Sequence, residues 1–561
     1  MGSFFRVLVC GLLLCCLLNL QAAGRWVEVE RGPFRVISDG NASAARIRLG
    51  QLEQFRYAFG MLTGTKEPQL VWQMEVLLSR DPLQPPALSR DAMVASVAET
   101  GPLPAAFLQS LAVQFVEDNL KRLPPDLETG LVALFSTIQS EGTRIRIGAP
   151  PDDPAKRTRG WGLLQMLVTD ENSRGEVHVF LYNLQQGADL NTACRGAFQQ
   201  PYAAIQDRLS HYLQAGSFGE ASFSGAAINP ARDFRADPLD SSEAGLALAD
   251  LALAAGSPNA GALYKAIHGP EADAGAGLAA LREGNKDEAR KSFEVAISQG
   301  TKSARVYFEM GILETDGSKK PADFAKAMER NPRWAEPHYQ MALALKNPAN
   351  QIAALQKAVS LEPRKTEWWR RLAETATSAG EFQEAAKAWT GASLAARSEE
   401  ERAQLANARE NMEEQRSDAI EAERKRKEEQ EAAELERVKQ QTLREIHASE
   451  NRANEALRAN EAGTVSNPVP YSSLDAQGPK LEGSLVNLDC RAKFSILSLQ
   501  DATGTVFHLV IGDRSQLSVP GSNVSIACGP QKSPRRIIVE YAPKADRKLG
   551  TIGEVRTVQF P

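Results

Sequence analysis

The sequence predicts a multidomain protein in which an α+β domain is followed by an all-α repeat array, a long charged helix and a small all-β barrel or sandwich. Residues 25–240 mix strand-like alternation with helix-like spacing of apolar residues. A pattern of small and aromatic residues repeats through residues 241–397. A proline-free charged stretch at 398–462 then precedes a linker at 463–479 and short β-rich runs at 480–561. With 561 residues, the chain is too long for one hydrophobic core.

Composition and charge exclude one broad class of partner. Charged residues make up 24% of the chain and hydrophobic residues 43%, as in ordinary soluble globular proteins. The formal net charge of -5 and the pI near 5.9 exclude a globally basic nucleic-acid binder. We therefore expect no nucleic-acid partner.

The first 24 residues have the features of a secretory signal peptide. Arg6 supplies a positive charge, residues 7–20 are almost wholly apolar, and Ala22-Ala23-Gly24 offers the small residues that a signal peptidase needs, with cleavage before Arg25. The apolar run is shorter than the ~20 residues of a comfortable membrane span, so a permanent anchor is the less favoured alternative. We expect export, either to a periplasm or out of the cell, and peripheral association with the envelope stays open.

The mixed zone at 25–240 begins with two paired strands. Residues 26–29 and 34–38 alternate apolar and polar side chains around a turn at Arg31-Gly32-Pro33. The spacing of apolar residues after this pair predicts further helices and strands. These are a helix at 44–62, a strand at 71–78, helices at 104–120 and 125–138, and a strand at 143–148.

Small and aromatic residues recur at matching spacings in the zone at 241–397. Small residues let paired helices approach closely, aromatic residues fill the space between them, and proline ends the second helix of a pair. The residues expected to pack the helices in this way are Gly277, Gly284, Ala289, Phe293, Ala296, Gly311, Phe324, Ala327, Pro332, Ala358, Pro363, Trp369, Ala373, Gly380, Ala385, Trp389 and Ala392.

This pattern resembles the tetratricopeptide repeat. Two copies are well formed, around residues 275–297 and 369–392, two copies between them are shortened, and residues 242–267 form a degenerate first copy. The resemblance implies helix pairs that stack into a superhelix whose groove binds a protein or peptide. Four basic residues are candidates for groove contacts with anionic groups: Arg364, Lys365, Arg370 and Arg371.

The stretch at 398–462 is dominated by charged residues and alanine, which predicts one solvated helix or a short coiled coil. Its apolar residues are too sparse for a clear heptad seam. The β-rich runs at 480–561 predict a small barrel, OB-like or SH3-like, or a sandwich. Cys490 and Cys528 both lie there, and we favour a disulfide between them over two buried thiols because export permits one.

Residues 123–137 resemble the corresponding segment of peptidase MA-like domains, which are zinc peptidases of the gluzincin type. Such domains carry a His-Glu-x-x-His helix and a downstream glutamate that together bind zinc. This chain has Gln109-Ser110-Leu111-Ala112-Val113 where that helix is expected and Thr129 where the resemblance places the glutamate. The resemblance therefore implies a degenerate domain that keeps the fold, and we expect no catalytic residue, no metal ligand and no cofactor.

These observations favour an exported, non-catalytic scaffold or adaptor that binds a protein or peptide through the repeat groove. A zinc-dependent or other peptidase with a displaced active site is one alternative. An envelope structural protein that docks through the long helix and the β-rich domain is another. The identity of the partner and the oligomeric state stay open.

Overall fold

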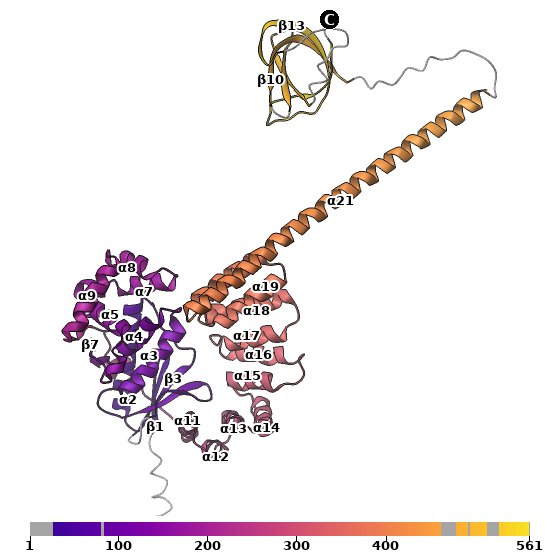
Figure 1. Ribbon diagram of the computed structural model, residues 1–561. Helices are drawn as coiled ribbons and strands as arrows, with labels where there is room; N and C mark the ends of the chain where they lie inside the picture. The colour runs from indigo at the N-terminus through magenta and orange to yellow at the C-terminus, as the bar shows by residue number, and fades with distance from the viewer. Residues whose placement is uncertain (1–25, 80–83, 462–477, 492–493, 513–526, 560–561) are drawn as a thin grey trace, which may run out of the picture. The chain divides into compact units, whose positions relative to one another are not determined.

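The structure is a computed structural model that describes residues 26–79, 84–461, 478–491, 494–512 and 527–559 (Figure 1). The predicted signal peptide at 1–24 and nearly all of the predicted linker at 463–479 lie outside these residues. Its contacts divide the chain into two compact units, Met1–Ala433 and Glu434–Pro561, and each unit is described by itself.

The first unit begins with a six-stranded sheet in the order β4-β5-β3-β2-β1-β9. β1 and β2 form the predicted antiparallel pair, and β2, β3 and β5 run parallel to one another. The strands span β1 Trp26–Arg31, β2 Phe34–Asp39, β3 Gln73–Leu78, β4 Ala87–Leu88, β5 Ala92–Val97 and β9 Asp237–Pro238.

Helices cover both faces of this sheet. Because successive side chains of a strand point to opposite faces, Val36 packs into the core with helices α2 (Ala42–Thr63), α3 (Ala105–Asn119) and α4 (Pro125–Phe135), whereas Ile37 packs on the other face. Ile37 there joins Ala244 and Ala247 of α11 (Ser241–Ala254). We predicted this helix as the start of a degenerate repeat, and in the structure it also covers the second face of the sheet.

A smaller antiparallel sheet of β6 (Gln139–Glu141), β7 (Arg144–Ile147) and β8 (Ala221–Ser224) adjoins this core. Short helices complete the domain. They are η1 Pro154–Lys156, α5 Arg159–Thr169, α6 Glu171–Arg174, α7 Val177–Gln185, α8 Leu190–Phe198, α9 Tyr202–Ala215 and α10 Pro230–Asp233.

The array continues as antiparallel helix pairs that stack on one another (Figure 1). After α12 (Ala260–Lys265), its four pairs are α13 Pro270–Arg282 with α14 Lys286–Ser298, α15 Ala304–Leu313 with α16 Lys320–Arg330, α17 Glu336–Ala344 with α18 Pro348–Leu361, and α19 Thr366–Ser378 with α20 Phe382–Ala395. The second and third pairs are the two that we predicted to be shortened.

The charged stretch forms one helix, α21 (Glu399–Glu461). Only its beginning packs on the array, where Leu405 and Met412 are buried with the last helix pair, whereas Ile420 and Leu435 are exposed. None of the helices in the described residues combines the length and apolarity of a membrane span.

The C-terminal part of the second unit is a closed barrel with the strand order β10-β11-β12-β14-β13. Its strands are β10 Lys480–Cys490, β11 Ser495–Gln500, β12 Val506–Ile511, β13 Gly529–Ala542 and β14 Gly553–Gln559. All neighbours are antiparallel except β12 and β14. This order, with its single parallel pair, is that of an OB-type barrel rather than an SH3-like barrel or a sandwich. A disulfide joins Cys490 to Cys528.

Candidate functional site in the repeat array

Glycines opposite aromatic rings set the spacing of the helices in the first two pairs. A Cβ atom on Gly277 would lie 2.5 Å from the Phe293 ring, and one on Gly311 would lie 2.7 Å from the Phe324 ring. Any larger residue would therefore push the two helices of the pair apart. In the last pair, Trp369 lies against Gly391 of the second helix, where a Cβ atom would approach the indole to 2.5 Å.

The other predicted packing residues lie inside the helix pairs or at their ends. Gly284 and Gly380 adopt left-handed backbone conformations, with φ of 82° and 79°, in the turns between the two helices of a pair. Pro332 and Pro363 follow the ends of α16 and α18. Fully buried residues of the array include Ala289, Ala296, Ala327, Ala358, Ala373, Ala385 and Ala392, and Trp389 is 4% exposed.

One edge of the array contacts the N-terminal domain through α11, the first turns of α13 and α15 and the later loops between helix pairs, and we call this edge the seam. At its first position, Arg90 forms ion pairs with Asp250 at 3.2 Å and with Glu271 at 2.7 Å. Asp250 also accepts hydrogen bonds from the Ser89 hydroxyl at 3.0 Å and the Tyr264 hydroxyl at 2.6 Å. The buried Asp250 carboxylate is thus fully engaged, as a buried charge must be.

The next two inter-repeat loops make similar contacts. The backbone N–H of Arg305 donates to the Asp91 carboxylate at 3.2 Å. The Asn331 side chain donates to the Val71 carbonyl at 3.1 Å, and the rings of Trp334 and Trp72 lie edge to face with centroids 4.9 Å apart. The contacts at these two positions therefore consist of hydrogen bonds with backbone groups and of packing between aromatic rings.

The last inter-repeat loop brings Arg364 to the N-terminal domain. Its guanidinium forms an ion pair with Glu128 at 2.7 Å and donates to the Leu120 and Lys121 carbonyls. Arg122 pairs with the same Glu128 carboxylate at 3.2 Å and donates to the Arg364 carbonyl at 3.2 Å. Arg364 is only 5% exposed, so it belongs to the seam.

This position corrects one sequence-based expectation, because a buried and paired Arg364 is not free to contact a ligand. The other candidates lie on the surface of the last pair. Lys365 pairs with Glu362 at 3.2 Å and lies over the Trp368 ring. Arg370 pairs with Glu374 at 3.7 Å, and Arg371 is exposed.

Two carboxyls at the seam titrate far above their ordinary range. Burial raises the pKa of Asp118 to about 7; the Val71 N–H, which donates to it at 2.8 Å, and Arg333 act in the opposite direction, and Glu117 and Glu362 add to the increase. Burial likewise raises the pKa of Asp91 to about 6 against the opposing charge of Arg90. Protonation of these half-buried carboxyls removes negative charge that is partly withdrawn from water.

A different surface of the array carries exposed apolar side chains, and we call it the open face. Ile312 is 42% exposed and Leu343 is 44% exposed. Each directly follows the small residue, Gly311 or Ala342, that packs its helix against the second helix of the pair. The two side chains therefore occupy equivalent positions on successive first helices. We did not single them out from the sequence. Their place after the small residue is not a sufficient signal, because Leu278, which follows Gly277, is only 4% exposed.

The two segments that we compared with the zinc motif of peptidases are structured, and their polar side chains make other interactions. Gln109 on α3 accepts a hydrogen bond from the Lys156 ammonium at 2.8 Å. The Thr129 hydroxyl on α4 donates to the Pro125 carbonyl at 3.0 Å. Among the described residues, no three His, Cys, Asp or Glu side chains gather as a metal site requires.

Comparisons with known proteins add only a partial likeness. No family model matches this chain, and no curated protein matches it. MamA from Desulfovibrio magneticus RS-1, from residue 41 to its end, is 20% identical over 29% of this chain and 98% of that chain, with a TM-score of 0.25. YrrB, described as a TPR protein with an unusual peptide-binding site, is 15% identical over 29% of this chain and 90% of that chain, with a TM-score of 0.25. The array is tetratricopeptide-like on the ground of its own helix pairs, glycines and prolines.

Proposed function

We propose that this protein is an exported, non-catalytic scaffold that binds another protein through the open face of the repeat array. The observation that carries the proposal is the pair Ile312 and Leu343, which expose apolar side chains at equivalent positions of α15 and α17, the first helices of successive pairs. Single exposed apolar residues are common, but a repeated one on stacked helices offers a partner a row of anchor points. Because the N-terminal domain already contacts the seam, the open face is the surface of the array that we expect a partner to bind.

The absence of catalysis is part of the proposal and has its own support. Gln109 and Thr129 stand where the resemblance to zinc peptidases places the metal-binding motif and the downstream glutamate. Neither an amide nor a threonine hydroxyl replaces the imidazole and carboxylate ligands of such a site. Metal analysis of the purified full chain should find substoichiometric zinc. Stoichiometric zinc together with chelator-sensitive cleavage of casein would instead establish the peptidase alternative.

Export is proposed from the apolar run that begins the sequence, at residues 7–20. A mature protein that begins at Arg25 and fractionates outside the cytoplasm is the expected result. Retention of the first 24 residues on a membrane-bound chain would support the anchor instead.

Protein binding is tested by capture from an envelope extract with the tagged full chain and two variants. The double variant Ile312→Glu with Leu343→Glu places charge on the open face, and Val295→Glu is the matched control, because Val295 is 44% exposed on α14, the second helix of its pair. We expect one set of proteins that the control retains and the double variant loses by at least about tenfold, the effect of about 1.4 kcal/mol. Equal recovery by all three chains would refute binding at this face.

A further inference from the structure

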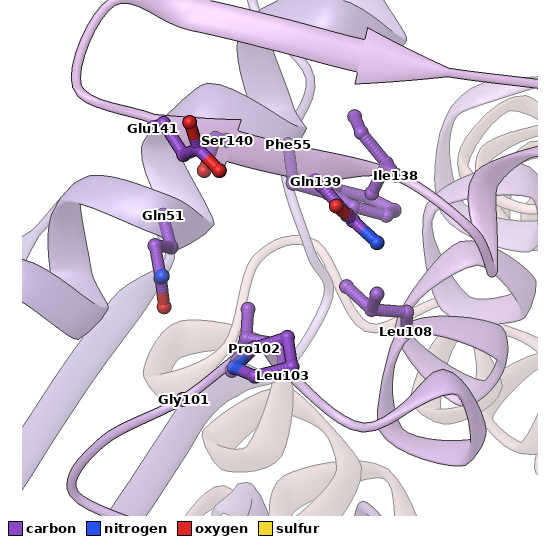
Figure 2. Close-up of a pocket in the computed structure, with 10 residues that line it drawn as sticks. All are labelled: Gln51, Phe55, Gly101, Pro102, Leu103, Leu108, Ile138, Gln139, Ser140 and Glu141. Carbon is purple, nitrogen blue, oxygen red and sulfur yellow. The ribbon is translucent and has the colours of Figure 1, made fainter. Parts of the chain in front are cut away.

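A pocket of about 320 Å³ lies in the N-terminal domain, away from the array. Its wall is mixed, because the apolar side chains of Phe55, Leu103, Leu108 and Ile138 share it with the polar residues Gln51, Gln139, Ser140 and Glu141. Figure 2 shows Gly101–Leu103 and Leu108 across the pocket from Gln139, Ser140 and Glu141. A pocket that offers apolar and polar groups side by side can hold an apolar side chain together with the polar backbone that carries it.

The pocket runs along the open edge of β6. β6 is an outer strand of its sheet and pairs only with β7. The side chains of successive strand residues point to opposite faces, yet Ile138, Gln139, Ser140 and Glu141 all line the pocket. A space that is lined by successive residues of one strand lies along the edge of the strand and not on one of its faces.

The backbone of Ser140 is free at this edge. β6 and β7 are joined by a two-residue turn, so the closing pair Glu141 and Arg144 exchanges hydrogen bonds, as does the pair Gln139 and Arg146. Ser140 lies between them, and its N–H and C=O point away from β7. In the part of the chain that the structure describes, neither group has a hydrogen-bond partner. An unpaired strand edge is a template for an added strand.

A buried cation lies behind one end of the same pocket. Arg48 is 1% exposed, and its Nη1 donates to the Gln51 side chain and to the Gly101 carbonyl, both at 2.7 Å. Gln51 and Gly101 both line the pocket. The Arg48 Nη2 is buried without a hydrogen-bond partner, and no described carboxylate lies within ion-pair distance of this guanidinium. Burial lowers the pKa of Arg48, in keeping with a charge that lacks a counter-ion.

We propose that this pocket binds the C-terminal end of an extended peptide whose last side chain is apolar. The peptide adds a strand to β6 by pairing with the Ser140 N–H and C=O. Its last side chain enters the space between Phe55, Leu108 and Ile138. Its terminal carboxylate lies at the Gln51 and Gly101 end, where it balances the buried charge of Arg48. The acidic rim residue Glu141 does not oppose this, because it is paired with Arg146 at 3.2 Å.

This site is separate from the proposed function of the open face, so the two are tested apart. The probe is a pool of labelled hexapeptides with random last four positions and a free carboxylate, offered to the full chain. The matched pool carries a C-terminal amide. We expect enrichment only from the free-acid pool, of peptides that end in an aliphatic or aromatic residue. No enrichment, or equal enrichment from the amide pool, would overturn the proposal.

Two variants place the enriched peptides in this pocket. Leu103→Trp fills the space, and Ser140→Pro removes the outward N–H, which the ladder with β7 does not use. Each should weaken binding by at least about tenfold without changing the circular dichroism spectrum. Tyr182→Trp is the matched control, because Tyr182 is 59% exposed on α7. Binding that survives both pocket variants, or that is lost in the double variant Ile312→Glu with Leu343→Glu, would place the peptides elsewhere and contradict the proposal.

Discussion

The two surfaces of the repeat array differ in what already contacts them. At the seam, the first turn of α13 supplies Glu271 and two later inter-repeat loops supply Trp334 and Arg364 to partners on the N-terminal domain. On the open face, Ile312 and Leu343 are more than two-fifths exposed. The array thus has one edge that contacts the N-terminal domain and one face whose apolar side chains are exposed. The difference supports the proposal that a partner binds at the open face and not at the seam.

The largest expected effect comes from breaking the seam at Arg364. Arg364→Ala removes a buried partner of Glu128, which keeps only Arg122 and the Leu123 N–H. We expect the free energy of unfolding to fall by about 3 kcal/mol, because one buried charge loses much of its compensation. Arg370→Ala is the control, since Arg370 is 56% exposed and its pair with Glu374 should contribute about 1 kcal/mol or less. Similar losses in chemical denaturation of the two variants would show that Arg364 does not fix the seam.

A smaller effect is expected from pH. The pKa of the folded Asp118 is raised to about 7, above the value of about 3.9 for an unfolded aspartate. Between these values the folded state holds the extra proton, so the free energy of unfolding should fall as pH rises from 5 to 8, by roughly 2 kcal/mol. Asp118→Asn should reduce the dependence of the free energy of unfolding on pH. Some pH dependence should remain, because the pKa of Asp91 is shifted in the same direction.

The control for this prediction is Asp418→Asn on the exposed surface of α21, which should leave the pH dependence unchanged. Denaturation curves at pH 5 and pH 8 provide the measurement. A wild-type chain that becomes more stable at pH 8 would contradict the raised pKa of the half-buried Asp118.

The smallest effect on stability is expected on the open face. Ile312→Glu with Leu343→Glu should change the free energy of unfolding by less than about 1 kcal/mol, because substitutions at exposed positions rarely cost more. Thermal and chemical unfolding of this double variant provide the check. A large loss of stability would mean that these side chains pack within the chain and are not an open surface.

Local regularities of the sequence predicted much of the array. The spacing of Gly277 to Phe293 encodes a contact between adjacent helices, and Gly284 and Gly380 mark turns that need a left-handed backbone. Such contacts join residues that are close in the chain, so the spacing of residues in a single sequence is enough to predict them. The composition of the charged stretch likewise predicted α21, because solvated helices need no partner.

Contacts between distant residues could not be predicted in the same way. Arg364 stands in a basic cluster that suggested a ligand contact, but its partner Glu128 lies 236 residues earlier in the chain. The same applies to β6, whose three polar residues give no strand pattern until β7 pairs with them. The choice between the barrel types depended on the parallel pairing of β12 and β14, which is also not local.

The most direct measurement compares the seam and the open face for the same partner. The dissociation constant of a protein captured by the wild-type chain would be measured for Arg364→Ala and for the double variant Ile312→Glu with Leu343→Glu. Binding through the open face predicts a change of less than about threefold for the seam variant and a loss of at least about tenfold for the double variant. Tenfold weaker binding by the seam variant, with the double variant unchanged, would contradict it and place the partner at the seam.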